Sequence, residues 1–180
     1  MAADCTLRHD SPPEAKIARF RSLFRGREDV YARRFESRKT GKSGYQPACV
    51  HEWVRGLCEK PQVKCGVCPQ RRFLPVTDQV IHQHLSGKDE AGHDLIMGLY
   101  PMLPDESCFL LVADFDKSSW QDDAAAFRET CRSLGLPVAL ERSRSGNGGH
   151  LWLVFSGGVT RGAGAKVGLV HPHRNHGTVP

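Results

Sequence analysis

An apolar run that ends in two acids lies in the second half of the chain, where residues 110–120 read LLVADFDKSSW. Such a run is typical of a buried strand, and side chains alternate along a strand, so Asp114 and Asp116 are expected on one face and Phe115 on the other. Carboxylate oxygens are the ligands that Mg²⁺ and Mn²⁺ prefer. The pair therefore predicts a divalent-metal site, with two solvated acids beside a helix N-terminus as the alternative.

The elements expected around this run define the fold class. Apolar segments bounded by turn residues predict strands at 94–100, 108–113, 138–142 and 151–155. A helix is expected over about 120–134, capped by Ser118 or Ser119, with Ala124, Phe127, Cys131 and Leu134 on its inner face. The order strand, helix, strand, loop, strand predicts a mixed α/β or α+β sheet with flanking helices.

The first half of the chain shows two further helix signals. Ser11 followed by two prolines and Glu14 predicts a helix start, with a stripe of apolar residues through Phe24. Thr77 is expected to cap a second helix that ends near Gly87. Residues 36–48 are expected to form a polar loop, and residues 157–180 a flexible or aberrant tail.

A glycine-rich basic loop precedes the last expected strand, in the segment ERSRSGNGGHLWLVF. Backbone N–H groups of such loops can approach phosphates closely, arginines add forked donors, and a histidine can donate to a phosphate oxygen. The alternative is a hairpin turn with an incidental histidine. The nucleotide-phosphate site predicted here consists of Arg142, Ser143, Arg144, Ser145, Gly146, Gly148, Gly149 and His150.

Four of the seven cysteines lie within twenty residues, at positions 49, 58, 65 and 68. Clustered thiolates are typical ligands of tetrahedral Zn²⁺, so Cys49, Cys58, Cys65 and Cys68 are predicted to bind one structural zinc. His51 could replace one of the four thiols. Separate structural thiols are the alternative.

Charge and hydropathy restrict the environment and the partners. Residues 1–72 carry a net charge of +8 and residues 73–180 carry −3, which favours a polyanion near the N-terminal half. No 18-residue apolar run and no apolar signal core is present, so neither a membrane partner nor secretion is expected. A cytoplasmic location is expected.

Together these segments resemble a known family. VADFD followed by SRSGNGGHLWLVF resembles motifs I and II of the archaeo-eukaryotic primase superfamily, the primase–polymerase fold. The segment LFRGREDVYARRFESRKTGKSGYQPAC, the cysteine cluster, FLPVTDQVI and DFDKSSW resemble the primase domain of TOTE conflict systems. The resemblance covers about residues 16–156.

The resemblance implies template-directed nucleotidyl transfer with Mg²⁺ or Mn²⁺, as in a DNA primase or polymerase acting in replication. Asp114 and Asp116 match the family's metal-binding acids, and His150 with the preceding loop matches the site for the incoming nucleoside triphosphate. The implied partners are a DNA or RNA template, nucleoside triphosphates, and helicase and nuclease modules.

The chain also departs from the family pattern. A third acidic motif is expected on a later strand, and residues 157–180 contain no Asp or Glu. A C-terminally truncated catalytic module lacking its third metal-binding acid is therefore expected. The alternatives are a non-catalytic zinc-containing nucleic-acid-binding module and a metal-dependent nuclease.

The expected organisation has four parts along the chain. They are a basic helical region at 1–48, a zinc-binding segment at 49–72, a partial primase–polymerase core at 73–156 and the tail at 157–180.

Overall fold

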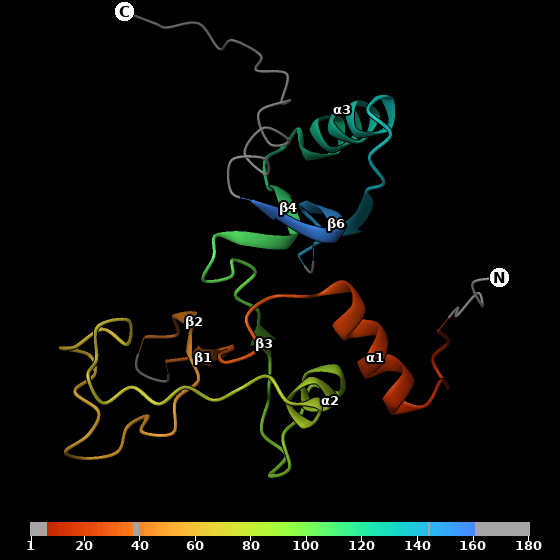
Figure 1. The fold of residues 1–180 in the computed structure, drawn as a ribbon. Coiled ribbons are helices and arrows are strands. Elements are labelled where there is room, and N and C mark those ends of the chain that lie inside the picture. Colours follow the sequence, from red (N-terminus) through yellow and green to blue (C-terminus); the bar gives the residue numbers. More distant parts are fainter. Residues whose placement is uncertain (1–6, 38–39, 144, 161–180) are drawn as a thin grey trace, which may run out of the picture. The chain divides into compact units, whose positions relative to one another are not determined.

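A computed structural model describes residues 7–37, 40–143 and 145–160. The chain divides into two compact units, Met1–Leu103 and Pro104–Pro180. The described residues form three helices and two antiparallel three-stranded sheets, one sheet in each unit (Figure 1). The mixed α/β class predicted from the sequence is therefore confirmed.

Two helices of the first unit begin and end near the predicted residues. Helix α1 spans Pro13–Leu23, and α2 spans Asp78–Ser86. Thr77 caps α2 as predicted, because its side chain accepts a hydrogen bond from the Val80 amide, and Gly87 ends the helix in the left-handed conformation. The predicted cap of α1 by Ser11 is wrong: Pro12 occupies that position, and the Ser11 hydroxyl accepts a hydrogen bond from the Arg8 amide.

The first sheet runs through a region predicted to be a loop. Strand β1 (Ala32–Glu36) pairs with β2 (Ser43–Pro47) on one edge and with β3 (Met97–Gly98) on the other. The prediction of a polar loop over 36–48 is therefore wrong, since β2 lies within it. Strand β2 forms although its residues show no apolar alternation, because hydrogen bonds to its hairpin partner β1 satisfy its backbone groups. The strand expected over 94–100 shortens to β3.

A small apolar core holds the first unit together. Phe20 on α1 packs against it and places its ring 5.7 Å from that of His84 on α2. Arg21 adds an ion pair at 2.7 Å to Asp78 at the start of α2. The buried members of the core are Tyr31, Ala48, Val76, Ile81 and Met97.

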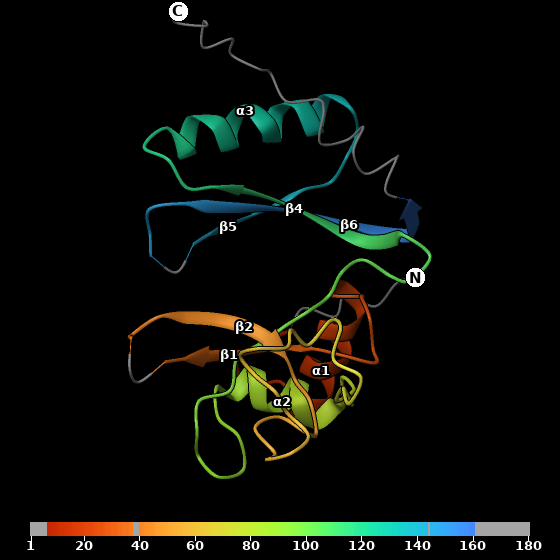
Figure 2. The same ribbon diagram turned by 90° about the vertical axis from the view of Figure 1, so that its left-hand side faces the viewer.

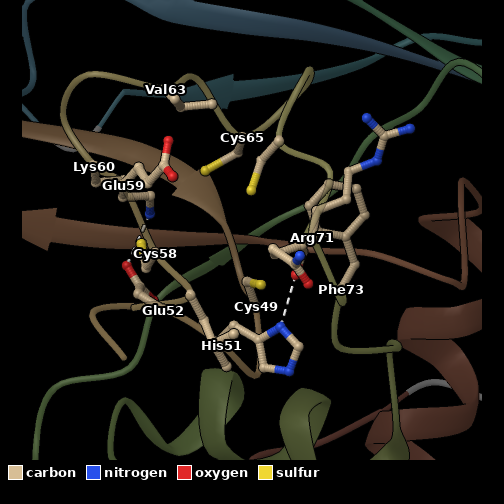
Figure 3. Close-up of a pocket in the computed structure, with 13 residues that line it drawn as sticks. Cys49, His51, Glu52, Cys58, Glu59, Lys60, Val63, Cys65, Arg71 and Phe73 are labelled. Carbon is tan, nitrogen blue, oxygen red and sulfur yellow. Dashed lines mark hydrogen bonds and ion pairs between the residues drawn. The ribbon is translucent and has the colours of Figure 1, made fainter. Parts of the chain in front are cut away.

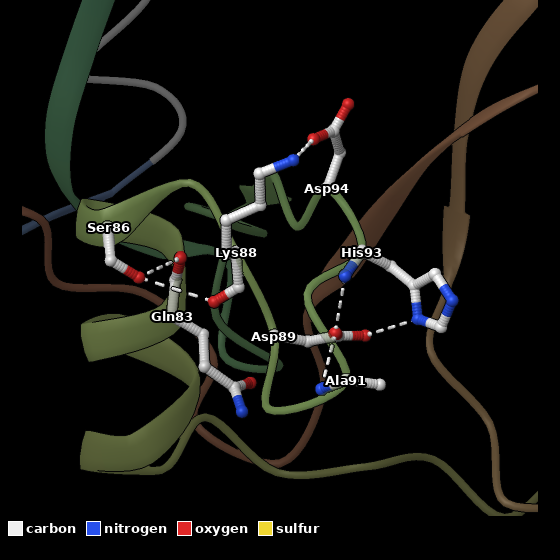
Figure 4. Close-up of polar contacts among 7 residues, drawn as sticks. All are labelled: Gln83, Ser86, Lys88, Asp89, Ala91, His93 and Asp94. Carbon is white, nitrogen blue, oxygen red and sulfur yellow. Dashed lines mark hydrogen bonds and ion pairs between the residues drawn. The ribbon is translucent and has the colours of Figure 1, made fainter.

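The loop that follows α2 is closed by its own polar side chains (Figure 4). The Asp89 carboxylate accepts hydrogen bonds from the amides of Ala91 and His93, at 3.0 and 2.8 Å. Lys88 forms an ion pair with Asp94 at 2.5 Å. The hydrogen bonds from His93 and Ala91 lower the pKa of Asp89, chiefly through the His93 amide.

The second unit is one helix packed on one sheet. Strand β4 (Ser107–Phe115) is followed by α3 (Trp120–Ser133), β5 (Ala139–Arg142) and β6 (Gly149–Thr160). The strand order is β4-β6-β5, so the last strand lies in the centre and runs antiparallel to both neighbours. Figure 2 shows α3 lying along one face of this sheet.

Alternation along the strands builds the core beneath α3. The register shifts between Cys108 and Leu110. Beyond this shift, the odd-numbered side chains of 111–115 on β4 and 149–155 on β6 face the helix, where Phe127 is 3% exposed and packs its ring against Phe115. The even-numbered side chains of these two segments therefore point to the opposite face. The buried core consists of Phe115, Ala124, Phe127, Cys131, Leu151 and Leu153.

Three predictions for this unit need correction. Leu134 is 55% exposed instead of inward, because α3 ends before it. The Ser119 hydroxyl donates to Asp123 and does not cap the helix backbone. Strand β6 continues through Thr160, into the predicted tail, because Cys108 and Ser107 at the start of β4 pair with Val159 and Thr160. Residues 161–180, the rest of that tail, lie outside the described residues.

None of the helices in the described ranges combines the length and the apolar composition that a membrane span requires.

Candidate functional site

The central position of β6 brings three ionisable side chains into one row across the sheet. In the register of the strands, His150 on β6 lies opposite Asp114 on β4 and opposite Glu141 on β5. Directly opposed side chains in an antiparallel sheet share a face, so all three lie on the face away from α3. Strand pairing therefore brings Asp114 and His150, which are far apart in the sequence, next to each other.

Distances within the row show that the histidine links the two acids. His150 Nε2 lies 3.5 Å from Asp114 Oδ1, and His150 Nδ1 lies 3.4 Å from Glu141 Oε2. The Trp152 indole N–H donates a hydrogen bond of 2.7 Å to the same Glu141 oxygen. The Asp114 side chain remains 66% exposed, whereas that of His150 is 32% exposed.

Glu141 is the member of this row that sequence reasoning missed. It stands at the start of ERSRSGNGGH, where it reads as one more charge before a basic loop. The available signal was its separation from His150: strands on either side of a tight hairpin place residues of equal distance from the turn opposite each other. That argument needs the hairpin residues to be known, and the expected strands ended at 142 and began at 151.

Asp116 follows directly after β4 and is exposed. Gly148 of the hairpin lies close to it, because a Cβ on Gly148 would come 2.6 Å from the Phe115 carbonyl oxygen and 3.4 Å from the Asp116 Cα. Only glycine fits this close approach. Within the described ranges, no group of three or more His, Cys, Asp or Glu side chains converges closely enough to hold a metal ion.

The predicted phosphate loop is a tight turn between β5 and β6. The Ser143 amide donates to the Gly148 carbonyl, and the Gly146 amide donates to the Ser143 carbonyl, both at 2.9 Å. Arg142 folds back so that its guanidinium donates to the Gly146 carbonyl. Ser145 accepts from the Asn147 amide. Within this turn Gly148 lies next to Asp116, and the Ser143 hydroxyl lies close to the same glycine, while Arg144 lies outside the described residues.

The four clustered cysteines line one small cavity in the first unit (Figure 3). The cavity has a volume of about 20 Å³, roughly the space of one water-sized sphere. All four thiols are free, and Cys49 Sγ accepts a hydrogen bond from the Arg72 amide at 3.3 Å. His51 also lines the cavity, but its Nδ1 faces the Gln70 carbonyl oxygen at 2.6 Å.

A charged pair lies against this cavity. Lys60 Nζ contacts Glu52 Oε1 at 3.1 Å and Gln46 Oε1 at 2.9 Å, and both ionic side chains are less than 15% exposed. Burial acts to lower the pKa of Lys60, but Glu52, with a smaller effect of Cys65, outweighs it and the pKa is raised. A cationic ammonium therefore stands beside Cys65.

Comparison with known proteins agrees with this arrangement. The chain matches the family model described as the TOTE conflict system, Archaeo-Eukaryotic Primase domain, over residues 15–170. The chain belongs to this family. A search of curated proteins returned no match. At the level of the family, TOTE primase domains imply primase-like nucleotidyl transfer, with nucleic acid and nucleoside triphosphates as partners.

Proposed function

We propose that this TOTE primase domain catalyses template-directed nucleotidyl transfer at the end of β4 in the second unit. The observation that carries the proposal is the pairing of Asp114 with His150 across adjacent strands, beside the hairpin of residues 143–148. This pairing unites an exposed carboxylate and a nitrogen donor beside a turn that contains Gly146 and Gly148. Those are the elements that binding a metal-bound triphosphate requires.

The residues present suit a divalent cation by donor type. Asp114 and Asp116 offer exposed oxygen ligands separated by one residue, as Mg²⁺ and Mn²⁺ prefer. When bound, such cations would activate the attacking hydroxyl and neutralise the leaving pyrophosphate. We assign the ligand role to these two acids.

The chain's own groups would hold the nucleotide around that centre. His150 Nε2 is the ring nitrogen on the Asp114 side, so it can donate to a triphosphate oxygen next to the acids. Gly148 and Gly149 let the phosphates approach the backbone, and the hydroxyls of Ser143 and Ser145 add donors. Arg142 supplies positive charge and, through Gly146, fixes the turn.

We also propose a structural zinc in the cysteine cavity. Residues 49–75 contain no helix, no strand and no buried side chain, so this segment has no apolar core of its own. Small units of this kind usually need a metal or disulfides to fold. The donor set Cys49, Cys58, Cys65 and Cys68 fits Zn²⁺, and both the Cys49–amide bond and the Lys60 ammonium would offset thiolate charge.

Metal analysis of the purified chain tests the zinc proposal. About one equivalent of zinc is expected, falling below half an equivalent in Cys65→Ser. The control Cys108→Ala removes a thiol of β4 in the other unit and should keep the metal content unchanged. Less than about half an equivalent in the wild type would contradict the proposal.

The first unit offers a surface suited to the nucleic-acid template. Residues 31–72 carry ten Lys and Arg against three Asp and Glu. The same segment contains Trp53, whose side chain is 66% exposed. Its backbone φ of 60° lies in the left-handed region, which L residues seldom adopt. Lys60 Nζ lies 5.5 Å from the centre of its ring. Exposed aromatics within a basic surface are typical of single-strand binding. We propose helicase and nuclease modules as further partners on the family match alone.

Incorporation of labelled nucleotide on a primed template in Mn²⁺ tests the catalytic assignment. Extension by the wild type that the Asp114→Ala, Asp116→Ala double variant loses would support it; equal extension would refute it. Template binding without extension would favour the non-catalytic binding module. Cleavage of the same template would favour a metal-dependent nuclease.

A further inference from the structure

Neither the sequence motifs nor the proposed chemistry assigns a role to Glu141. Its carboxylate lies on the same face as His150 and Asp114, one strand beyond the histidine. Adjacent strands are about 4.8 Å apart, so Asp114 and Glu141 are separated by roughly two strand spacings with the imidazole between them. A direct role beside Asp114 as a shared metal ligand does not follow from this spacing.

The Glu141 oxygen that faces His150 is fixed from a second side. Trp152 lies two residues beyond His150 on the same strand, and its indole N–H donates to Glu141 Oε2 at 2.7 Å. The rings of Trp152 and His150 meet edge to face, with centroids 6.3 Å apart. The indole therefore holds the carboxylate next to the imidazole and also restricts the rotation of the imidazole.

His150 Nδ1 needs such a partner. This nitrogen is buried and makes no well-formed hydrogen bond within the described part of the chain, and Glu141 Oε2 lies 3.4 Å from it. A carboxylate oxygen can only accept, so the contact is favourable when Nδ1 carries a proton; an imidazolium, protonated at both nitrogens, can donate from Nδ1 to Glu141 and from Nε2 to a phosphate oxygen. The partner of one ring nitrogen sets the orientation and the protonation of the other.

We infer that Glu141 is a positioning residue, which acts with Trp152 to orient the His150 ring so that Nε2 is presented to a nucleotide phosphate beside Asp114. The inference rests on the proposed function for its ligand, a nucleoside triphosphate. Glu141 touches neither the phosphate nor the metal in this account. Its effect on binding therefore passes entirely through His150.

The first test observes the ring directly. In the full chain carrying ¹⁵N-labelled histidine, NMR should show His150 with a protonated Nδ1, the signals being assigned by their loss in His150→Ala. Glu141→Ala should change these ring signals, and Trp152→Phe, which removes the indole N–H and leaves a smaller aromatic ring, should change them in the same direction. Glu129→Ala, which removes an exposed carboxylate from α3, is the matched control. Unchanged His150 signals in Glu141→Ala would overturn the inference.

The second test measures affinity for ATP and dATP with Mg²⁺ by calorimetry in a double-mutant cycle. Glu141→Ala should weaken binding about tenfold, as loss of an orienting partner typically does. The same substitution in the His150→Ala background should weaken nucleotide binding no further, because Glu141 acts only through the His150 ring, which is then absent. Equal losses in both backgrounds would indicate a general structural effect and overturn the inference alone. No binding by the wild type would instead contradict the proposed function, and the NMR comparison would then decide the contact between Glu141 and His150.

Discussion

Phe127 is the residue that joins α3 to the sheet of the second unit. It is 3% exposed, and its ring centroid lies 5.9 Å from that of Phe115 in an edge-to-face arrangement. Phe115 directly precedes Asp116 at the end of β4, so packing on the helix side holds the backbone that presents the two acids on the other. The position of the two acids therefore depends on the apolar contacts between α3 and the sheet.

Replacement of Phe127 by alanine should destabilise the second unit by about 3–5 kcal/mol, the usual cost of removing a buried aromatic ring. Leu134→Ala, at an exposed position just beyond the same helix, should cost less than about 0.5 kcal/mol. Urea unfolding followed by circular dichroism compares the two. Similar losses for both variants would contradict the packing described for α3.

His84 predicts a pH dependence for the first unit. Burial lowers the pKa of His84 below its ordinary 6.5, and its Nδ1 accepts a hydrogen bond from the Met97 amide, which requires an unprotonated Nδ1. Below pH 6.5 the unfolded chain therefore binds a proton that the folded chain resists. The stability contributed by the neutral ring is complete above that value and is lost as the pH falls through the lower pKa of the folded state.

Urea unfolding at a series of pH values checks the His84 prediction. The decline in stability on acidification should flatten in His84→Gln, whose side-chain oxygen can accept the same hydrogen bond without titrating. His82→Gln, at an exposed position on the same helix, should leave the decline as in the wild type. If the stability of His84→Gln declined with falling pH as steeply as that of the wild type, the His84 ring would not be the cause of the decline.

At the scale of elements, the cysteine segment and the hairpin of residues 143–148 are both turns stabilised by local contacts. The hairpin has strands on both sides to fix its ends. The cysteine segment is held by the bridge from Cys49 to Phe73, by local backbone hydrogen bonds and by the partly buried Lys60–Glu52 pair. Because this segment has no apolar core, an exposed side chain such as Trp53 removes no buried contact from it.

Trp53→Ala should weaken binding of a fluorescein-labelled oligo-dT strand by about 5- to 100-fold in anisotropy titrations, the usual range for loss of one stacked base. Val67→Ala removes another strongly exposed apolar side chain of the same segment and should have little effect. The salt dependence should stay the same in Trp53→Ala, since no phosphate contact is removed. Equal affinity of Trp53→Ala and wild type would exclude stacking on this ring.

The elements that the sequence predicts best are those in which a pattern and a terminator agree. Thr77 and Gly87 delimit α2 correctly, and the apolar period of 120–134 indicates α3. The strand β2 is missed because its residues, SGYQP, have no apolar alternation and gain their conformation from pairing with β1. The end of β6 is missed for the same reason, since Gly157 and Gly158 read as loop residues until the start of β4 pairs with this segment.

The candidate site was predictable in part. The acids and the glycine loop follow from residue type and spacing, whereas the register that places Asp114 opposite His150 is known only from the structure. The role of Glu141 depends on the central placement of β6, which no local pattern reveals, because the chain inserts its last strand between two earlier ones. The folding back of Arg142 onto Gly146 likewise requires the turn geometry.

At the scale of the molecule, the two units divide the proposed tasks. The first unit holds the basic segment with Trp53 and the cysteine cavity, and the second holds the acids, His150 and Glu141 on one sheet face. The account therefore predicts that substitutions in the first unit change template affinity, while those on the sheet face of the second change nucleotide binding and catalysis. A family match over residues 15–170 spans both units.

The central claim is that the carboxylates at the end of β4 carry nucleotidyl transfer. Single-nucleotide incorporation on a primed template in Mn²⁺, measured for Asp114→Asn beside Asp122→Asn, tests it most directly. Asp122 is an exposed acid in the first turn of α3, so its variant controls for loss of one negative charge nearby. The account predicts a loss of at least about 100-fold for Asp114→Asn, the order of effect expected when charge stabilisation in the transition state is removed, with Asp122→Asn unchanged. Incorporation at the wild-type rate by Asp114→Asn would contradict it.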